Sequence, residues 1–297
     1  MDVSSRLFLA DQWDSEQYAL LDSGDGQKWE RFGEQSVIRP DPQAFWHPNQ
    51  PVEHWRADAR FDAKSGDDDR GQWQLINPSA AETWPMQWRG LRFQARRTPF
   101  RHLGLFQEHS VHWAFAQDHI RAADQKVRLL NLFGYTGLMS LAAAQAGADV
   151  THLDASPKSN GYGKDYAALS GLSAARIRWI ADDAMKFTAR EIRRGNQYDA
   201  IVLDPPKFGR GTKNETWRFE SDLPALLANV RALLSETPLF VILTAYAVRL
   251  SHIALAQALA SQLSGLGGRI EMGEMALPHA QDDRLLPTSI CARWRCD

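Results

Sequence analysis

Acidic side chains stand at the ends of successive apolar runs in the second half of the chain. Asp154 ends one such run, Asp182 and Asp183 end the next, and Asp204 follows a third. Because the carboxyl ends of parallel strands meet at one edge of a sheet, we expect these carboxylates to border one cleft. Such a row of acceptors suits ribose hydroxyls, an adenine amine and a cationic ligand. Each aspartate taken alone could instead be a helix N-cap.

A glycine-containing turn precedes these carboxylates. An apolar run from Val127 to Leu132 meets Gly134 and Gly137, and Asp154 follows 17 residues after Gly137. Glycines here permit a sharp turn from strand to helix and let a ligand approach bare backbone. A carboxylate at Asp154 would then accept hydrogen bonds from a ribose.

The turn lacks the full dinucleotide fingerprint GxGxxG. Leu132 occupies the place of the first glycine and Phe133 follows it, so a pyrophosphate would find the approach crowded. A ligand with a ribose and a small carboxylate but no phosphates fits better, and S-adenosylmethionine is such a ligand. An ordinary βαβ turn without a ligand and a dinucleotide-binding fold remain the alternatives.

The segment Asp204, Pro205, Pro206, Lys207 and Phe208 forms a second candidate site. Each proline fixes its own φ and restricts the residue before it, so the corner is stiff and its acceptors are held in one position. An exocyclic base amine is a poor nucleophile because its lone pair is delocalised into the ring. Acceptors for its protons would favour a pyramidal nitrogen, and Phe208 could stack on the base. A plain β-turn with a capping aspartate is the alternative.

Strand-like and helix-like segments alternate after residue 126. The strands expected in the alternating part are 127–132, a segment ending at 154, 177–183, 198–208 and 238–247. Residues 269–277 and 288–296 add two strands without a helix between them, which implies an antiparallel hairpin at one sheet edge. The pattern predicts a Rossmann-like α/β fold: a seven-stranded, mostly parallel sheet with helices on both faces and an antiparallel C-terminal hairpin.

Residues 1–90 have a different texture and predict a small β-rich N-terminal extension, a candidate for substrate recognition, before an α/β domain over 91–297. Short alternating segments are separated by turn signals such as SGDGQ and PDPQ. The tryptophans of this region could stack on bases, but such a number in a small β unit is more typical of a core. They are Trp13, Trp29, Trp46, Trp55, Trp73, Trp84 and Trp88.

A basic segment, LRFQARRTPFRH, joins the two regions. It holds Arg92, Arg96, Arg97 and Arg101 within ten residues. Four arginines interleaved with aromatic rings could grip a phosphate backbone, and a solvated strand face is the equal alternative. If Arg96, Arg97 and Arg101 line one rim with Lys207, Arg210 and Lys213, that rim would face a phosphate backbone.

Composition narrows the class of protein. The chain of 297 residues has a formal net charge of −2, so a nucleic-acid contact would need a local basic patch. No apolar run is long enough for a membrane span and the start lacks the pattern of a signal peptide, which predicts a soluble, cytoplasmic protein. Cys291 and Cys296 offer neither a disulfide framework nor zinc spacing.

The segments NLFGYTG, THLDAS, ADDAMKF, YDAIVLDPPKFGRG and LFVILTAYA resemble the successive motifs of class I S-adenosylmethionine-dependent methyltransferases. More narrowly, they resemble the bacterial branch that includes the large-subunit ribosomal RNA cytosine and guanine methyltransferases. The resemblance covers about residues 100–297. It implies S-adenosyl-L-methionine as the cofactor, with no metal, and RNA as the substrate.

The resemblance also implies a role for each motif. Asn131, Gly134 and Gly137 would border the methionine end of the cofactor, Asp154 would hold the ribose and Asp183 would contact adenine. Residues 204–208, Asp204 included, would face the target. Phe106 and Glu108, in the segment GLFQEH, would close over the cofactor. The remaining residues expected to contact it are Phe133, Tyr135, Ala155, Ser156, Asp182 and also Asp204.

Two departures from the family pattern matter. Methylation of cytosine carbon-5 in this branch requires a cysteine nucleophile after the fifth strand, where this chain reads LTAYAVRLS. The first 90 residues show no clear match to the RNA-binding module of some relatives. We therefore predict direct methyl transfer to an exocyclic base amine in RNA, with ribosomal RNA as the expected substrate. Methylation of a protein side-chain amide and a catalytically lapsed RNA adaptor remain alternatives, and the oligomeric state is left open.

Overall fold

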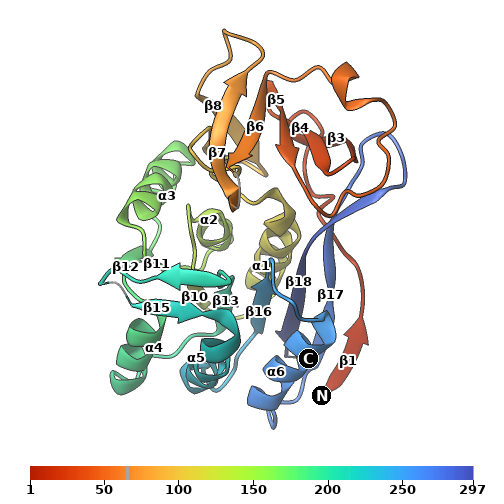
Figure 1. Ribbon diagram of the computed structural model, residues 1–297. Helices are drawn as coiled ribbons and strands as arrows, with labels where there is room; N and C mark the ends of the chain where they lie inside the picture. The colour runs from red at the N-terminus through yellow and green to blue at the C-terminus, as the bar shows by residue number, and fades with distance from the viewer. Residues whose placement is uncertain (65–66, 214, 297) are drawn as a thin grey trace. The chain divides into compact units, whose positions relative to one another are not determined.

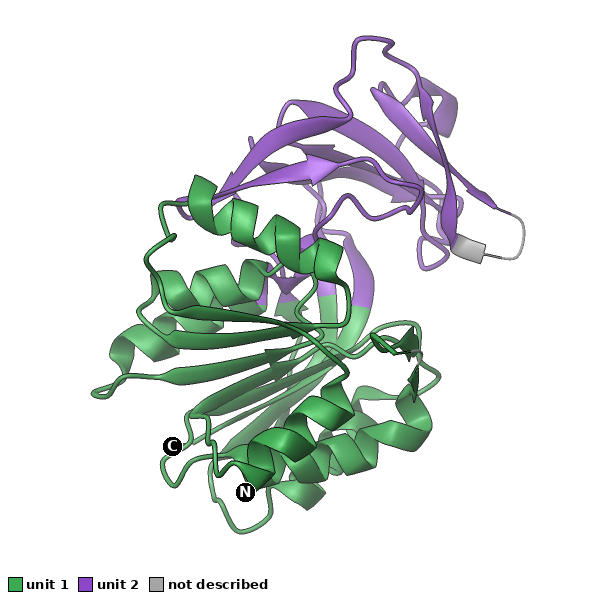
Figure 2. Cartoon of the chain, turned by 90° about the vertical axis from the view of Figure 1, so that its left-hand side faces the viewer, with its two compact units in different colours: residues 1–8, 112–275, 289–297 green, residues 9–111, 276–288 purple. Residues whose placement is uncertain are grey.

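The computed structural model describes residues 1–64, 67–213 and 215–296. The chain divides into two compact units (Figure 2). Unit 1 comprises residues 1–8, 112–275 and 289–297, and unit 2 comprises residues 9–111 and 276–288. The compact unit that holds the N-terminal strands thus continues past residue 90, and the domain boundary expected there stays a prediction.

Unit 1 is built on a mostly parallel sheet with helices on both faces (Figure 1), which confirms the predicted fold class. In the described residues the sheet has the order β1-β17-β18-β16-β13-β10-β11-β12, and β2 also pairs with β17. The strands are β1 (Asp2–Ser5), β2 (Phe8–Leu9), β10 (Arg128–Leu132), β11 (Asp149–Asp154), β12 (Ile177–Ala181), β13 (Ala200–Leu203), β16 (Phe240–Ala245), β17 (Arg269–Pro278) and β18 (Leu285–Arg295).

Helices connect these strands in the predicted alternation. They are α1 (Ser110–Ala122), α2 (Leu138–Gln145), α3 (Pro157–Leu169), α4 (Ala184–Arg193), α5 (Phe219–Leu233) and α6 (His252–Gln262). Alternation along β10 explains the two layers: Leu130 and Leu132 join the core formed with α4, α5 and α6, whereas Asn131 points to the other face and bonds to Ser140 of α2. Alternate residues of β10 therefore contact the two helical layers.

The C-terminal hairpin does not end the sheet as expected. β18 lies between β16 and β17, and β1 covers the outer edge of β17 in parallel register, with Asp2 opposite Arg269. An ion pair from Arg6 to Glu271, 3.0 Å long, holds the start of the chain there. Residues 1–5 were expected in the N-terminal extension; they join this sheet because β17 would otherwise leave its backbone groups unpaired.

Unit 2 contains a sheet in the order β3-β4-β5-β6-β7 and the separate pair β8-β9. Burial of Trp55, Trp84 and Trp88 confirms the core interpretation for these three tryptophans. The elements are β3 (Tyr18–Gly24), β4 (Gln27–Phe32), β5 (Gln35–Pro40), the 3₁₀ turn Val52–His54, β6 (Ala59–Lys64), β7 (Asp67–Leu75), β8 (Thr83–Trp88), β9 (Leu91–Arg96) and the 3₁₀ turn Gln107–His109.

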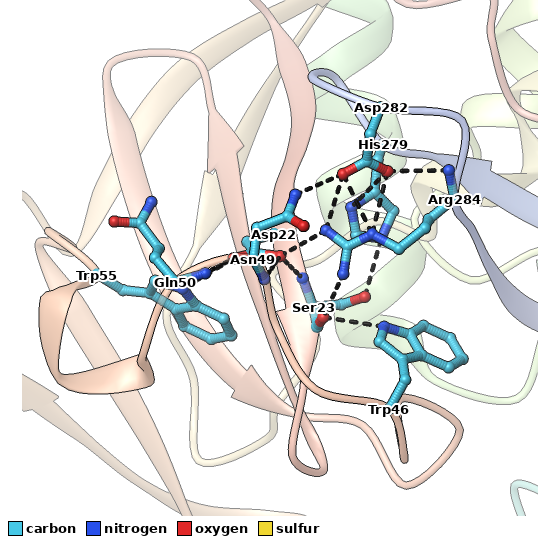
Figure 3. A network of polar contacts seen from close by, with 9 residues as sticks. All are labelled: Asp22, Ser23, Trp46, Asn49, Gln50, Trp55, His279, Asp282 and Arg284. Atoms are coloured by element: carbon cyan, nitrogen blue, oxygen red, sulfur yellow. Dashed lines mark hydrogen bonds and ion pairs between the residues drawn. The ribbon is translucent and has the colours of Figure 1, made fainter.

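A buried polar network ties residues 276–288 into unit 2 (Figure 3). The Arg284 guanidinium donates to Asp22 at 2.8 Å and to Asp282 at 2.8 Å. His279 Nε2 lies 2.9 Å from the Ser23 hydroxyl. Asp22 is 1% exposed, and its carboxylate also accepts from backbone N–H groups and one indole. The network therefore stabilises the hairpin tip, because it provides hydrogen-bond partners for a buried charge. Figure 3 also draws Trp46, Asn49, Gln50 and Trp55.

In the part of the chain that the structure describes, no helix combines the length and apolarity needed to cross a membrane.

Candidate active site

The loop after β10 has the sharp turn that the glycines predicted. Gly137 has φ 85°, in the left-handed region that favours glycine, and it begins α2. Gly134 is required for a different reason: a Cβ there would meet the His152 ring at 2.4 Å. Phe133 and Tyr135 take positive φ values of 56° and 51°. The loop is thus held in a strained conformation whose bare backbone lies at the carboxyl edge of the sheet.

Asp154 is the last residue of β11, and both oxygens of its carboxylate accept backbone hydrogen bonds. The Tyr135 N–H donates to Oδ2 at 2.8 Å and the Ser156 N–H donates to Oδ1 at 2.8 Å. Burial raises the pKa of Asp154, while these two bonds oppose that shift. Each oxygen retains a second lone pair, so the carboxylate can also accept hydroxyl groups of a ligand.

The residues after Asp154 start the next helix. Ala155 leads into Ser156, the N-cap of α3, whose hydroxyl accepts from the Ser159 N–H at 3.1 Å. The helix N-cap at this strand end is therefore Ser156 and not an aspartate. Asp154 instead ties the end of β11 to the β10 loop.

A buried polar chain beneath the loop escaped the sequence reasoning. Asn131 Nδ2 donates to Ser140 Oγ at 3.0 Å, and Ser140 Oγ lies 2.9 Å from His152 Nδ1. Burial lowers the pKa of His152 to about 4, so the ring is neutral and shares a hydrogen bond with the Ser140 hydroxyl. Trp179 of β12 fills the space that Gly137 and Gly163 leave, at 2.9 and 2.3 Å from their virtual Cβ positions. Glycine is therefore required at both positions, because a Cβ at either one would clash with the Trp179 ring.

Asp182 and Asp183 follow β12, as predicted, but engage different partners. Asp182 accepts from Arg190 at 2.6 Å and from the Asp183 N–H at 2.8 Å. Asp183 is the N-cap of α4, where its Oδ1 accepts from the Lys186 N–H at 2.9 Å. The N-cap alternative therefore holds for Asp183, and its contact with adenine stays a prediction.

Asp204 directly follows β13, and its Oδ1 accepts a hydrogen bond from the Thr244 hydroxyl at the end of β16. Pro205 is buried and Pro206 is exposed. The Pro206 carbonyl accepts from Trp217 Nε1 at 2.7 Å, and the Trp217 ring lies 5.1 Å from that of Phe133. Trp217 thus joins the proline corner to the β10 loop. Sequence reasoning missed it, although a tryptophan in a short polar hairpin after DPPKF was the available signal.

Lys207 and Phe208 lead into a small hairpin of β14 (Phe208–Arg210) and β15 (Thr216–Arg218). The Phe208 side chain is 65% exposed, and Lys207 Nζ lies 5.6 Å from the centre of its ring. The ring therefore has a face open to a ligand.

Phe106 and Glu108 belong to unit 2, in the segment that contains the 3₁₀ turn Gln107–His109. Glu108 is 9% exposed. The Gln107 side chain donates to the buried Glu30 at 3.0 Å, and Trp13 donates to the Gln107 carbonyl at 2.9 Å. Unit 2 thus fixes this segment, and its closure over a cofactor stays a prediction.

The predicted basic rim is wrong for part of its members. Arg97 is 6% exposed and donates to Gln35 at 2.6 Å and to the Ala80 carbonyl at 2.8 Å. Arg101 binds Asp69 at 2.7 Å, and its side chain is 13% exposed. These two arginines therefore stabilise unit 2. Tertiary structure brings their partners to them, and local spacing in the sequence does not reveal such contacts. Arg92 is exposed.

A cavity of about 530 Å³ opens at the opposite edge of the unit 1 sheet, lined among others by Arg128, Arg176 and Arg178. Each of these arginines forms an ion pair, with Asp199, Asp149 and Glu191 respectively. The cavity lies at the amino ends of the strands, away from Asp154 and Asp204. Because ligands of open α/β sheets bind at the carboxyl ends, we place the candidate site there and not in the cavity.

The sheet order and the polar groups at its carboxyl edge define a Rossmann-like α/β protein of the nucleoside-cofactor class. A sequence profile of S-adenosylmethionine-dependent methyltransferases matches residues 57–242, and the chain belongs to this family. It is therefore an enzyme whose cofactor is S-adenosyl-L-methionine. The match begins well before residue 100, where the motif resemblance was expected to start.

Solved structures agree with this assignment. A SAM-dependent methyltransferase from Agrobacterium tumefaciens is 42% identical, with a TM-score of 0.94 over 99% of this chain and 95% of that chain. The structure of SMU.776, a methyltransferase complexed with SAH, has a TM-score of 0.69 over 94% of this chain and 75% of that one. At 18% identity the second likeness shows the fold alone.

Curated relatives include the ribosomal RNA large subunit methyltransferases K/L. The protein from Shewanella baltica is 34% identical over 151 residues, which are 50% of this chain and 20% of that protein. The protein from Shewanella frigidimarina is 31% identical over 166 residues, 55% of this chain and 22% of that protein. The chain thus matches about a fifth of the length of these relatives.

Proposed function

We propose that this enzyme transfers the methyl group of S-adenosyl-L-methionine to an exocyclic amine of a base in ribosomal RNA. The observation that carries the proposal is the proline corner, where Thr244 and Trp217 hold Asp204 and the Pro206 carbonyl at the carboxyl edge of the sheet. A corner fixed from two sides presents its acceptors without reorganisation, which is what stabilises a developing charge.

The residues of the same edge fit the cofactor. Asp154 holds the two ribose hydroxyls, the bare backbone at Gly134 and Gly137 admits the methionine portion, and Asp183 contacts adenine. The cofactor supplies an activated methyl group on a sulfonium.

The corner prepares the nucleophile. The Asp204 carboxylate and the Pro205 carbonyl accept hydrogen bonds from the two amine protons, so the nitrogen lone pair turns out of conjugation and toward the methyl group. Phe208 stacks on the target base. The cofactor would supply a methyl group whose bond to sulfur breaks to leave a neutral thioether, and Asp204 or water would take the proton that the amine nitrogen loses on methylation.

A thiol route is not needed. Burial raises the pKa of Cys291, so its thiol stays neutral and is a poor nucleophile. The side chain lies in β18 opposite Thr244 and not at the far edge of the sheet, where we had expected it. It is enclosed between paired strands, which leaves no space for a base.

The names of the curated relatives support ribosomal RNA as the substrate. The local match to proteins called ribosomal RNA large subunit methyltransferase K/L covers half of this chain. The cytoplasm, where ribosomes and the cofactor meet, is the proposed location.

Mass spectrometry of RNA nucleosides tests the proposal. Ribosomal RNA from a deletion strain should lack one N-methylated nucleoside, and the purified enzyme with labelled S-adenosyl-L-methionine should restore it. A missing carbon-5 methyl group would overturn the amine mechanism. Label that enters ribosomal proteins and leaves RNA unlabelled would instead identify a side-chain amide as the acceptor.

A further inference from the structure

We propose that the outer face of the β14–β15 hairpin binds a single-stranded RNA segment that flanks the target nucleotide. The outer face is defined by Phe208, Arg210, Thr216 and Arg218. The proposal rests on the proposed function, because it names how the RNA substrate is held next to the corner that carries Asp204.

The register of the hairpin sorts its side chains onto two faces. Phe208 pairs with Arg218 and Arg210 pairs with Thr216, so these four side chains point to the same side. All four are exposed. Gly209 and Trp217 form the intervening pair, and Trp217 is 4% exposed. The outer face therefore consists of one aromatic ring, one hydroxyl and two guanidinium groups.

The inner face fixes the hairpin on unit 1. Besides the Trp217 contacts with Pro206 and Phe133, the Phe219 N–H donates to the Lys207 carbonyl at 3.0 Å. A Cβ on Gly209 would lie 3.2 Å from the Pro206 ring, so glycine lets the hairpin pack closely on the corner. The outer face is thus held immediately beside the proposed target position.

The charge of the hairpin is strongly positive in a protein of net charge −2. Among its described residues from 207 to 218 the cations are Lys207, Arg210, Lys213 and Arg218, and no ion pair to a described carboxylate engages their side chains. The acid of the segment, Glu215, instead pairs with Lys186 of α4 and accepts the Lys213 N–H. These contacts, the Lys186 bond first, lower the pKa of Glu215 to about 2.

Three other arginines of unit 1 are neutralised by carboxylates. Arg128, Arg178 and Arg190 each form an ion pair with a carboxylate of the same unit. Close to the hairpin, Asp222 is engaged by the backbone N–H of Arg218 and by the Ser221 hydroxyl. The outer face therefore keeps its positive charge for a polyanion.

Single-stranded RNA fits this face better than a duplex does. The Phe208 ring can stack only on a base that is not already paired and stacked, while Arg210, two residues along β14, and Arg218, opposite Phe208 on β15, hold phosphates. One ring flanked by two cations on the same face suits a base with a phosphate on either side of it along one nucleic-acid strand. The same reasoning leaves a continuous duplex without a contact for Phe208.

Binding of a labelled single-stranded RNA oligonucleotide tests the proposal by fluorescence anisotropy over a salt series. R210A/R218A should lower the affinity about 10-fold at moderate salt and reduce the salt slope by about 1.4, because two phosphate contacts on a single strand are lost. R210K/R218K should recover most of the affinity because it keeps the charge. The matched control R176A/R193A removes two cations from the amino-end side of the sheet and should bind RNA as the unchanged enzyme does.

Calorimetry with S-adenosyl-L-methionine checks that R210A/R218A keeps its cofactor affinity and therefore its fold. Unchanged RNA affinity in R210A/R218A, an equal loss in R176A/R193A, or preference for a duplex of the same sequence would overturn the proposal. The binding assay needs no methyl transfer. RNA that binds this face without being methylated would contradict the proposed function alone, and methylation with an unchanged KM in R210A/R218A would contradict the docking face alone.

Discussion

Two strands of the unit 1 sheet have an aspartate at each end, and the aspartates at the amino and carboxyl ends have different hydrogen-bonding partners. β11 begins with Asp149 and ends with Asp154, and β13 is flanked by Asp199 and Asp204. At the amino end, Asp149 pairs with Lys126 at 3.2 Å and Arg176 at 3.4 Å. At the carboxyl end, the donors to Asp154 are backbone N–H groups at 2.8 Å.

The second strand repeats this contrast. Asp199 accepts the Arg128 N–H at 2.8 Å and the Arg128 guanidinium at 3.2 Å, whereas Asp204 accepts a hydroxyl of Thr244. A carboxylate neutralised by an arginine stabilises the fold, while one held by neutral donors keeps its charge for a ligand. We therefore expect the partner, more than the residue type, to distinguish an aspartate that binds a ligand from one that stabilises the fold.

The largest effect is expected at Asp204. Asp204→Ala should lower the rate of methyl transfer by about two to three orders of magnitude, because it removes a preorganised acceptor. Single-turnover measurement with saturating cofactor reports this step. Asp199→Ala, at the other end of the same strand, should keep the rate within a few-fold, and an equal loss of rate in both variants would erase the contrast between the two edges.

Asp154 should govern cofactor affinity. Asp154→Ala loses charge-assisted hydrogen bonds to the ribose, which should weaken binding of S-adenosyl-L-methionine by about 2 to 4 kcal/mol. Isothermal titration calorimetry measures it, with NAD as a second ligand that should not bind because Leu132 and Phe133 crowd a pyrophosphate. Equal affinity in the variant, or preferential binding of NAD, would contradict the assignment.

The pH dependence of cofactor binding sharpens the same point. Burial raises the pKa of Asp154, and the ribose hydroxyls require its charged form. Affinity should therefore be complete above that raised pKa and fall as the pH drops through it, at a higher pH than for an exposed aspartate. Titrations between about pH 4 and 8 would show the fall in the unchanged enzyme. Asp154→Asn, which cannot ionise, should remove it, and a fall that persists there would assign the titration to another group.

The local elements of this site could be predicted from the sequence, but the long-range contacts that hold them in place could not. Gly137 and the strand ends at Asp154 and Asp204 follow from periods and turns within one βα unit, which the chain encodes locally. Trp217 reaches the Pro206 carbonyl only because the hairpin folds back, and the pairing of β1 with β17 joins opposite ends of the chain. Such contacts depend on tertiary structure.

The same limit explains the errors about charge. Arg97 and Arg101 read as a basic stripe in the sequence, yet each has polar partners within unit 2. Asp183 and Asp154 read alike as acids after strands, and hydrogen bonding alone shows the first to be an N-cap. A sequence gives the position of an ionisable group but not the partner that determines its role.

The amino-end pair should affect stability and not chemistry. Asp199→Ala leaves the Arg128 N–H without its acceptor and should lower the free energy of unfolding by about 1 to 2 kcal/mol, a modest value because the Arg128 side chain is 49% exposed and screened. Urea unfolding measures this change. Asp199→Asn keeps an acceptor for the Arg128 N–H and should recover part of the lost free energy of unfolding. A larger loss in Asp199→Asn than in Asp199→Ala would contradict this role of the carboxylate as an acceptor.

The smallest effect on catalysis is expected from the cysteines. One strand, β16, separates Cys291 from Asp204: Cys291 pairs with Thr244, which donates to Asp204, so proximity alone would make the thiol a rival nucleophile. Its burial raises the thiol pKa and encloses the sulfur, while Cys296 is exposed near the end of β18. Cys291→Ser and Cys296→Ser should therefore retain methylation, with some loss of thermal stability in the first because a hydroxyl replaces a buried thiol. Activity that disappears in either variant while the fold persists by circular dichroism, or a covalent complex trapped with a fluorinated pyrimidine, would move the chemistry from the Asp204 corner to a thiol.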